Sequence, residues 1–413
     1  MPRFSADHQF AFDWLEPDAN AISKDAGRFL DEVLAGDLVH SRVLISCGKH
    51  KKRDRAKAAD LYTSPRFRMS VGIARQLALP FSILSAKHGL LSPNKTVEPY
   101  DLQLSSLSAE SRLAWSKAVF KAIISAKPAI TRVIVLAHDE YAHDLVPALR
   151  QEGTEVIEPM RGFSDNSRMM FLNACLRKLE RRSAVQKIYA QFERHEKGTN
   201  LFTLQEALRH DLPNQGVYFF FDPNEPTQFS KVVPRLVRVG THGVSEGSKA
   251  SLRNRLRTHL GTGEGLGNHR SSVFRLHVGD ALIRKNNMRD QFPHWGKGQT
   301  TEIEIRRREA ELESAVSTYI SQLQIVVLEV SDQANKESAR SLIERLSIAV
   351  FTEDFFPIEE PSLDWLGLFS QHQTIVQTGL WNLRDSGSRA DLQIVDLLRE
   401  RVIADLKKGS VRT

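Results

Sequence analysis

The chain has 413 residues, of which 41% are hydrophobic and 26% charged, so its length and composition fit a globular protein of two or three domains. Its 57 Lys and Arg residues against 50 Asp and Glu residues give a net charge of +7, which suits a polyanionic partner. Two cysteines exclude a disulfide framework and a four-cysteine zinc site. No apolar run approaches the roughly 20 residues of a membrane span, and the N-terminus lacks a signal-peptide pattern, so we expect a soluble cytoplasmic protein with no membrane contact.

The first half of the chain alternates short apolar runs with amphipathic ones. Short β-branched runs bounded by turn residues predict buried strands at 42–46, 81–85, 132–136 and 155–158. Helical patterns follow near 66–79, 108–127, 140–151 and 165–182. This order predicts an α/β domain at 41–182, a mostly parallel sheet with helices on both faces, preceded by an N-terminal extension at 1–40.

The second half has a different order of elements. A polar, charged stretch at 183–205 predicts a helical linker, and residues 206–413 are expected to form an α+β domain. Strands are predicted at 216–221, 236–239 and 324–330. Helices are predicted, after a basic one that follows the second strand, at 303–322, 336–347 and 390–408.

Three short motifs follow one another in this second half. Gly-Val-Tyr at 216–218 begins one strand, Arg-Val-Gly at 238–240 ends the next, and Arg-Leu-Arg-Thr-His at 255–259 lies on the basic helix. In this order and spacing they resemble the GIY-YIG nuclease family. The stretches at 267–279 and 342–350 resemble a restriction-like branch of that family. The resemblance implies a GIY-YIG-like fold with DNA as its substrate.

The residue types of these motifs fit phosphodiester hydrolysis, which requires a deprotonated water and a cation for the charge that develops at phosphorus. Tyr218 would take the proton of the water, and Arg255 presents a planar fork of donors to phosphoryl oxygens. His259, one helical turn after Arg255, would orient Tyr218 or contact phosphate. His242 is a second candidate for the base. The alternatives are a core aromatic for Tyr218 and a solvated helix face for Arg255.

By the resemblance, Glu344 would bind one Mg²⁺ or Mn²⁺, a hard ion that accepts a single carboxylate together with water and substrate oxygens. Glu337 and Glu353 are competing ligands, and a plain surface glutamate is the other interpretation of Glu344. Arg238 stands where the family usually has Tyr, which keeps open a protein that binds DNA without cutting it. The side chains of this half expected to contact nucleic acid are Arg238, His242, Arg253, His269, Arg270 and Asn382.

Four segments of the first half also stand in order, at 46–52, 59–64, 84–91 and 98–101. They resemble the YaaA-like proteins, which implies association with DNA, and a more distant similarity to base-handling domains of the uracil-glycosylase type implies a nucleobase pocket. Phosphate would be bound by Lys49, Lys51 and Lys52, unless this lysine run is only a solvated loop. The residues predicted to form the nucleobase pocket are Cys47, Tyr62, Ser85, Lys87, His88, Tyr100 and Asp101.

Together these features predict a Mg²⁺- or Mn²⁺-dependent DNA endonuclease whose first domain recognises particular or modified DNA, in restriction or defence against phage. Two alternatives stay open. In one, the first domain excises a base and the second cuts the abasic strand. In the other, the nuclease fold has lost catalysis and the protein only binds DNA. Cleavage of both strands would favour a homodimer.

Overall fold

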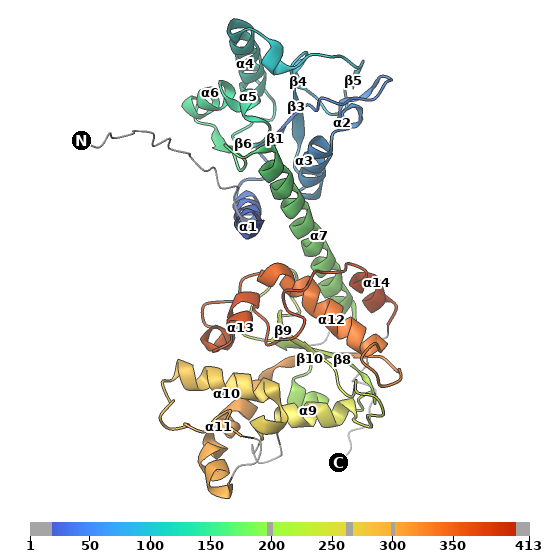
Figure 1. Cartoon of the computed structure of the whole chain (residues 1–413), viewed down its shortest axis with the longest axis vertical. Helices are drawn as coiled ribbons and strands as arrows, with labels where there is room; N and C mark the ends of the chain where they lie inside the picture. Colours follow the sequence, from blue (N-terminus) through green and yellow to red (C-terminus); the bar gives the residue numbers. More distant parts are fainter. Residues whose placement is uncertain (1–18, 196–200, 262–266, 299–301, 402–413) are drawn as a thin grey trace, which may run out of the picture. The chain divides into compact units, whose positions relative to one another are not determined.

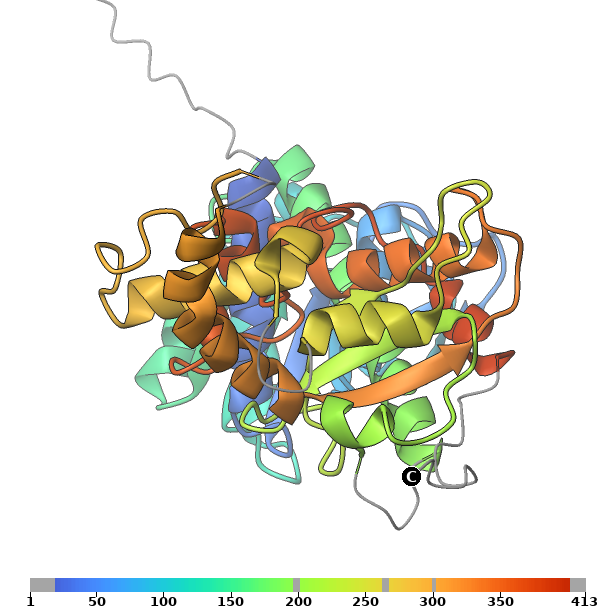
Figure 2. The same ribbon diagram turned by 90° about the horizontal axis from the view of Figure 1, so that it is seen from below.

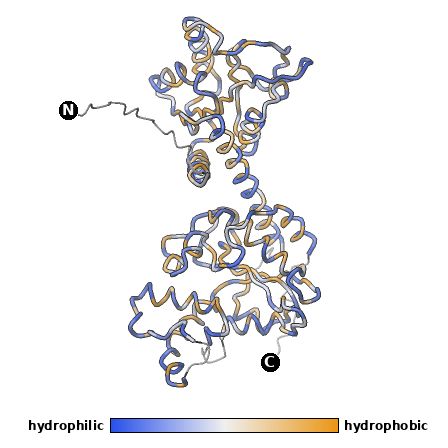
Figure 3. Tube along the Cα trace, viewed as in Figure 1, coloured by the Kyte–Doolittle hydropathy of each residue, from blue (hydrophilic) through white to orange (hydrophobic). Residues whose placement is uncertain are grey.

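A computed structural model describes residues 19–195, 201–261, 267–298 and 302–401 (Figure 1). The chain divides into two compact units, residues 1–180 and 181–413, and each unit has its own central sheet. Hydrophobic residues follow the strands of both sheets (Figure 3). Among the described helices, none has the length and apolar character required to cross a membrane.

The first unit is built on a five-stranded sheet in the order β4-β3-β1-β6-β7. Its strands are β1 (Ser41–Ser46), β3 (Phe81–Ser85), β4 (Gly89–Leu91), β6 (Arg132–Leu136) and β7 (Glu155–Ile157). Strand β4 is antiparallel to β3, whereas the other neighbours pair in parallel. The mostly parallel sheet is the one that the sequence predicts. A separate antiparallel pair joins β2 (Ala56–Lys57) to β5 (Thr96–Val97).

Helices cover both faces of this sheet, as the prediction requires. Alternate residues of a strand point to opposite faces, so Val43 packs in one core and Leu44 in the other. The Val43 face is covered by α1 (Ala19–Ala35), α2 (Ala58–Leu61), α3 (Pro65–Gln76) and the first half of α7 (Asp165–His195). The Leu44 face is covered by the 3₁₀ helix η1 (Leu104–Ser106), α4 (Ala109–Ile124), α5 (Asp139–Ala142) and α6 (Leu145–Gln151).

Helix α1 changes the interpretation of the segment predicted as an extension. Phe29 and Val33 of this helix are buried in the same core as Val43. The described part of residues 1–40 therefore belongs to the first unit, and residues 1–18 lie outside the described residues.

Helix α7 passes from the first unit into the second, because the boundary between the units falls at residues 180 and 181. Its second half carries an apolar stripe at positions i, i+3, i+4 and i+7, which is the pattern of a helix packed on a core. The buried residues of this stripe are Val185, Ile188, Tyr189 and Phe192. The predicted linker at 183–205 is thus a core element of the second unit up to His195, and residues 196–200 lie outside the described residues.

The second unit is built on an antiparallel sheet in the order β10-β8-β9. Its strands are β8 (Gly216–Asp222), β9 (Arg235–Gly240) and β10 (Gln324–Glu329). One face packs against the second half of α7, α12 (Ala339–Thr352) and α14 (Ile394–Arg399). The other face packs against α8 (Leu204–Ala207), α9 (Leu252–Leu260), α10 (Val273–Lys285) and α11 (Ile303–Gln322) (Figure 2). Ile375 of α13 (Gln373–Thr378) belongs to the same core.

Three short 3₁₀ helices complete the second unit: η2 (His269–Ser271), η3 (Glu353–Phe355) and η4 (Leu366–Phe369). The last helix is shorter than the amphipathic pattern at 390–408 predicts. Helix α14 ends at Arg399, and residues 402–413 lie outside the described residues. Central strand β8 is buried along its whole length, since it has a neighbour on each edge and a core on each face.

Candidate active site

A cleft of about 1010 Å³ opens in the second unit beside the end of β9, between residues of α9, α10 and α12. The residues predicted for the site that line it are Arg238, His242, Arg255, Glu344 and Asn382. They come from strands and helices far apart in the sequence, so the fold brings them together. The cleft also contains ionisable residues that the motifs do not include: His277, Lys336, Arg384 and Asp385.

Tyr218 lies behind this cleft, fully buried in β8. It is directly opposite Gly240 in the ladder of β8 and β9. A Cβ atom at position 240 would overlap the Tyr218 hydroxyl, so only glycine fits there. The glycine that ends the second motif is therefore required by the tyrosine that ends the first. The next residue, Thr241, lines the cleft.

The Tyr218 hydroxyl forms a hydrogen bond with His259. The phenol oxygen and Nε2 are 2.7 Å apart, and His259 Nδ1 lies 2.8 Å from the Ser272 hydroxyl oxygen. Burial holds the pKa of His259 well below its usual value, and the guanidinium groups of Arg255 and Arg238 act in the same direction. His259 is therefore a neutral imidazole with one donor and one acceptor nitrogen, and it holds the Tyr218 hydroxyl in place.

Glu344 reaches the cleft from α12. Its Oε1 accepts a hydrogen bond from the backbone N–H of Thr241 at 3.2 Å, so Glu344 and the Tyr218 hydroxyl both contact the Gly240–Thr241 segment. Burial raises the pKa of the Glu344 carboxyl, and nearby Asp385 raises it further, whereas Arg238 opposes the shift. A partly buried carboxylate next to a second carboxylate is an environment that a divalent cation would stabilise.

The competing ligands do not reach this cleft. Glu337 is exposed before the start of α12. Glu353 is buried elsewhere in the unit, where it accepts the backbone N–H of Ala390 and lies 3.6 Å from Arg181. The described residues contain no group of three or more His, Cys, Asp or Glu side chains that would form a complete metal cage. A cation at Glu344 would thus depend on water and substrate oxygens, a coordination that Mg²⁺ accepts.

Two arginines of the cleft have unused donors. Arg238 donates from Nη1 to the Trp381 carbonyl oxygen at 2.8 Å, and its guanidinium lies 4.7 Å from the centre of the Phe274 ring. Its Nε is buried with no hydrogen-bond partner, and the same holds for Nε of Arg255. Buried donors without acceptors are unfavourable. Oxygens of an anionic ligand would satisfy both.

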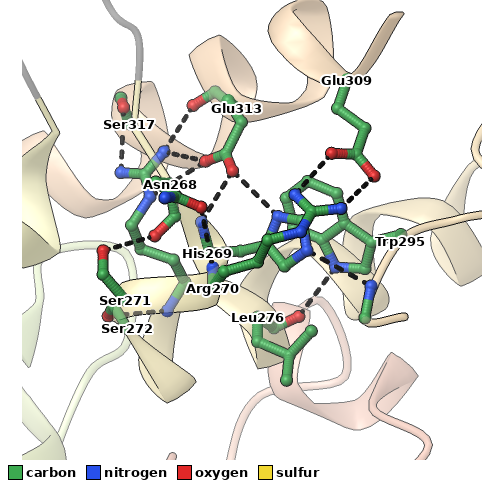
Figure 4. A network of polar contacts seen from close by, with 12 residues as sticks. Asn268, His269, Arg270, Ser271, Ser272, Leu276, Trp295, Glu309, Glu313 and Ser317 are labelled. Carbon is green, nitrogen blue, oxygen red and sulfur yellow. Dashed lines mark hydrogen bonds and ion pairs between the residues drawn. The ribbon is translucent and has the colours of Figure 1, made fainter. Parts of the chain in front are cut away.

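His269 and Arg270, predicted to contact nucleic acid, have a different role (Figure 4). Arg270 donates to both carboxylate oxygens of Glu309, at 2.7 and 3.0 Å, and His269 Nδ1 lies 2.9 Å from Glu313 Oε1. The His269 ring also stacks on Trp295, with ring centres 3.8 Å apart. Both side chains are almost fully buried. The prediction for these two residues is corrected, because carboxylates of α11 already pair with them.

Arg275 joins this buried network to the site. It pairs with the Glu313 carboxylate and donates from Nη1 to the carbonyl oxygens of His259 and Leu260, at 2.9 and 3.0 Å. These are the last carbonyls of α9, which a cation stabilises. Ser272, the partner of His259, also caps α10 by accepting the backbone N–H of Arg275. Arg275 therefore fixes the backbone of His259, and Ser272 fixes its imidazole ring.

Of three further predicted residues, Arg253 and Asn382 are held by the fold, whereas His242 lines the cleft as a weak base. Arg253 donates to the carbonyl oxygens of Leu208 and His210 and thereby anchors α9, and it does not line the cleft. Burial and the charge of Arg340 lower the pKa of His242 to about 4, which makes it a weak base at neutral pH. The Asn382 side chain pairs with both the N–H and the C=O of Val239, at 3.1 and 2.8 Å, so its amide fixes the edge of β9.

His277 was not among the predicted site residues, although it lies in the stretch 267–279 that resembles the restriction-like branch. This side chain lines the cleft and is only 3% exposed, and neither ring nitrogen has a hydrogen-bond partner. Burial, with His372 and Arg238 nearby, lowers its pKa to about 3, so it presents a neutral imidazole. The signal in the sequence was a lone histidine on the apolar face of a helix, which is also the signature of an ordinary core residue.

In the first unit, most residues predicted for the nucleobase pocket gather around Tyr100. Its hydroxyl lies 2.8 Å from the Tyr62 hydroxyl and 2.7 Å from that of Ser85, and the rings of His88 and Tyr100 meet edge to face at 5.3 Å. Lys51 and Lys87 approach the Tyr100 ring at 4.5 and 5.6 Å. Burial raises the pKa of Tyr62 to about 12 and also raises the pKa of Tyr100, so the two bonded phenols stay neutral, whereas Lys87 and His88 are exposed.

A separate cavity of about 360 Å³ lies in the same unit. Of the residues predicted for the nucleobase pocket, Cys47 and Asp101 line it. Of the lysines predicted for phosphate, Lys49 and Lys51 line it, whereas Lys52 is exposed outside its lining.

Comparisons with known proteins agree with this division. A family model described as the GIY-YIG domain matches residues 179–408, and a model described as a family of unknown function (DUF6884) matches residues 43–174. No curated protein matches the chain, and no solved structure matches it. The first match covers more than half of the chain and contains every residue of the cleft, which confirms the resemblance in the second half. The second match does not show a relation to the YaaA-like proteins.

Proposed function

Because the chain belongs to the GIY-YIG domain family, whose domains are nucleases, we propose that it is a DNA endonuclease that depends on one divalent cation, Mg²⁺ or Mn²⁺. The observation that carries this proposal is the cleft at the end of β9, where two arginines with unused buried donors stand beside a carboxylate with a raised pKa. A phosphodiester would supply acceptors for the arginine donors, and a cation would supply positive charge for the carboxylate.

In this proposal Arg255 and Arg238 bind the oxygens of the scissile phosphate. Guanidinium groups offer several N–H donors in one plane and stay charged at any working pH. Arg238 takes the place of the tyrosine that the family usually has in its second motif, so the chain replaces a hydroxyl with a fixed positive charge. That charge favours the transition state, in which negative charge on the phosphoryl oxygens is greatest.

Tyr218 is the proposed general base and His259 its positioning residue. The hydroxyl lies against the backbone of Gly240, one residue from the cleft. His259 does not store the proton, because three guanidinium groups near it disfavour an imidazolium. As the proposed general base, Tyr218 would take the proton of the attacking water, directly or through a second water.

Glu344 would hold the cation, with Asp385 as the second carboxylate of the same wall. When bound, a divalent cation stabilises negative charge on phosphoryl oxygens and lowers the pKa of water. The residues fit such an ion. Burial and the charge of Asp385 disfavour the ionised form of Glu344, and a nearby cation would stabilise that form.

Cleavage of a supercoiled plasmid tests the proposal, with Mg²⁺, Mn²⁺ or EDTA present. Glu344→Gln should abolish cleavage, lower the affinity for Mn²⁺ measured by calorimetry, and leave DNA binding mostly intact. Glu337→Gln is the matched control, because Glu337 is exposed near the same helix and outside the cleft. Wild-type cleavage by Glu344→Gln, or equal Mn²⁺ affinity in both variants, would refute the metal assignment.

We also propose that the first unit selects the DNA, in restriction or defence against phage. The support is the run of lysines in the loop after β1 and the cavity beside it, since phosphate contacts give affinity while contacts to the base give selectivity. Cleavage rates across a panel of plain and modified plasmids, for the whole chain and for Asp101→Asn, test it. If the wild type and Asp101→Asn cut all plasmids of the panel at equal rates, the first unit does not select the DNA. Release of free base would favour the excision alternative.

A further inference from the structure

The cavity of the first unit lies where ligands bind in open α/β sheets. It is lined by the segments that leave the carboxyl ends of the parallel strands β1 and β6, residues 46–51 and 136–141. The chain continues from β1 to β3 on one side of β1, whereas β6 pairs on the other side. The segments after β1 and β6 therefore leave the sheet in opposite directions, and such a divergence leaves a crevice between them at the carboxyl ends of the strands.

One wall of the cavity offers free donors. The loop after β1 packs directly on the first turn of α3, since a Cβ atom at Gly48 would meet the Ser64 hydroxyl. The Ser64 side chain does not cap the helix. Within the described ranges, the backbone N–H groups of Gly48 and Lys49 donate to no backbone carbonyl, and those of Arg66 and Phe67 belong to the first turn of α3, which has no intrahelical acceptor for them. A helix N-terminus, free amides and the charge of Lys49 together form a site for an anion, beside Arg66, whose Nη1 pairs with Asp165 at 2.9 Å.

A buried hydroxyl independently indicates a missing ligand. Ser70, on the second turn of α3, lines the cavity and is 1% exposed, yet its Oγ has no hydrogen-bond partner. His138, at the end of β6, also lines the cavity, with Nδ1 buried and without a partner. A buried polar atom in a folded protein normally has a partner, and a ligand with polar atoms would provide one here.

The remaining walls have a different character. Phe67 and Tyr141 give aromatic surface, and Leu102 adds aliphatic surface. Hydrogen-bond acceptors come from segments other than those that carry the lysines, as the carboxylates of Asp101 and Glu140. We propose that the cavity binds a 5′-phosphorylated nucleoside, with its phosphate at the β1 loop and the start of α3, and a base carrying an exocyclic amino group toward these carboxylates.

This chemistry has two sources, a free nucleotide or a nucleotide rotated out of a DNA strand. The volume of about 360 Å³ suits one nucleotide unit in either case. Only the second source rests on the proposal that the first unit selects DNA. Binding of a free nucleotide involves neither the cleft of the second unit nor a divalent cation. The nucleotide proposal can therefore be refuted while the nuclease proposal stands, and the reverse also holds.

Calorimetry of the whole chain with dAMP, dCMP, dGMP, TMP, deoxycytidine and inorganic phosphate tests the inference, in EDTA. We expect saturable binding of the three amino-bearing nucleotides, at least tenfold tighter than deoxycytidine and about fivefold tighter than TMP. Binding of none of these nucleotides, together with no base rotation in the assay below, would overturn the proposal. Equal binding of nucleotide and nucleoside would also overturn it, because the phosphate would then contribute nothing.

Variants locate the site. Ser70→Ala removes only the hydroxyl and should weaken nucleotide binding at least fivefold, and Lys49→Ala should weaken nucleotides but not deoxycytidine. Lys49 is exposed, so that variant keeps the test valid if Ser70→Ala does not fold. Lys52→Ala and Arg68→Ala are matched controls in the same loop and helix, outside the cavity lining. Unchanged binding in both Ser70→Ala and Lys49→Ala would contradict the location.

A duplex that carries 2-aminopurine separates the two sources, with Glu344→Gln as the host to prevent cleavage. A rise in fluorescence on binding that excess dAMP reverses would identify a nucleotide rotated out of DNA. Saturable dAMP binding without that rise would identify a free nucleotide. Either result supports the cavity as a nucleotide site and decides where the nucleotide comes from.

Discussion

Two pairs of arginines in the second unit have different surroundings and therefore different roles. Arg238 and Arg255 line the cleft with buried Nε atoms that lack acceptors. Arg270 and Arg275 are buried against Glu309 and Glu313 on α11. What separates the pairs is the presence of a carboxylate opposite the guanidinium. Arg270 and Arg275, which have such a partner, stabilise the fold, whereas Arg238 and Arg255, which line the cleft without one, are available for a phosphate.

The largest effect should come from breaking the buried pairs. Arg275→Ala leaves Glu313 as an uncompensated buried charge, and we expect a loss of about 3–5 kcal/mol in the free energy of unfolding. Chemical denaturation measures this loss. Arg284→Ala, at an exposed position of the same helix, is the control. Replacing Arg275 and Glu313 together by leucine should cost less than Arg275→Ala alone, and a larger cost would show that the pair itself stabilises the unit.

Next comes the effect on cleavage. Arg255→Ala should lower the cleavage rate by about 10²- to 10³-fold, the usual scale for one preorganised donor, at unchanged melting temperature. Plasmid cleavage and a thermal melt measure the two quantities. Arg257→Ala changes an exposed residue of the same helix and should alter neither. A near-normal rate in Arg255→Ala would place Arg255 with the solvated arginines.

A smaller effect is expected in DNA affinity. Arg238→Ala should weaken binding of the cleavage-inactive Glu344→Gln protein to all sequences alike and lower the slope of log affinity against log salt by about 1. Titrations at several salt concentrations measure this slope, with Arg289→Ala as an exposed control outside the cleft. An unchanged slope would mean that Arg238 serves only to hold Trp381 and Phe274.

The smallest effect distinguishes the two carboxylates by pH. Burial raises the pKa of Glu344, so this group contributes stability at low pH that is lost as the pH rises through its folded pKa. Burial also opposes ionisation of Glu313, but the hydrogen bond from His269 and the charge of Arg275 outweigh it and lower its pKa. Stability from Glu313 is therefore present at neutral pH and is lost as the pH falls.

Melting temperatures of Glu344→Gln between pH 4 and pH 8 check this sign, in EDTA. The variant should be at least as stable as the wild type at neutral pH, and its advantage should disappear toward low pH. A variant less stable than the wild type at neutral pH would make Glu344 a stabilising residue of the fold. The opposite trend is expected for Glu313→Gln, which should lose most stability at neutral pH.

Much of the fold could be predicted because its signals are local. Strands β1, β3, β6, β8 and β10 fall where short apolar runs predict them. The register of β8 and β9 could be inferred in part from the motifs, since Tyr218 and Gly240 pair directly. The resemblance to the GIY-YIG family also implied that Arg255 and Glu344 share one site, and the cleft contains both of them and Arg238.

The errors arise where the deciding partner lies far along the chain. His269 and Arg270 look like a basic patch because Glu309 and Glu313 come about forty residues later, on another helix. The second half of α7 looks like a linker because its core partners come after residue 216. In the first unit, the sequence does not indicate that the hydroxyls of Tyr62 and Tyr100 bond to each other, because the two residues lie 38 positions apart.

Helix α7 also has a consequence during synthesis on the ribosome. Its first half can pack as soon as residue 179 has emerged, but the stripe of its second half packs on residues as far along as Leu398. About 200 residues separate the end of α7 from Leu398, which take about 10–40 s to translate at about 5–20 residues per second. Phe219 and Phe229 can cover part of the stripe formed by Val185, Ile188, Tyr189 and Phe192 early, but the rest stays exposed until its later partners emerge, so we expect a chaperone to bind this stripe.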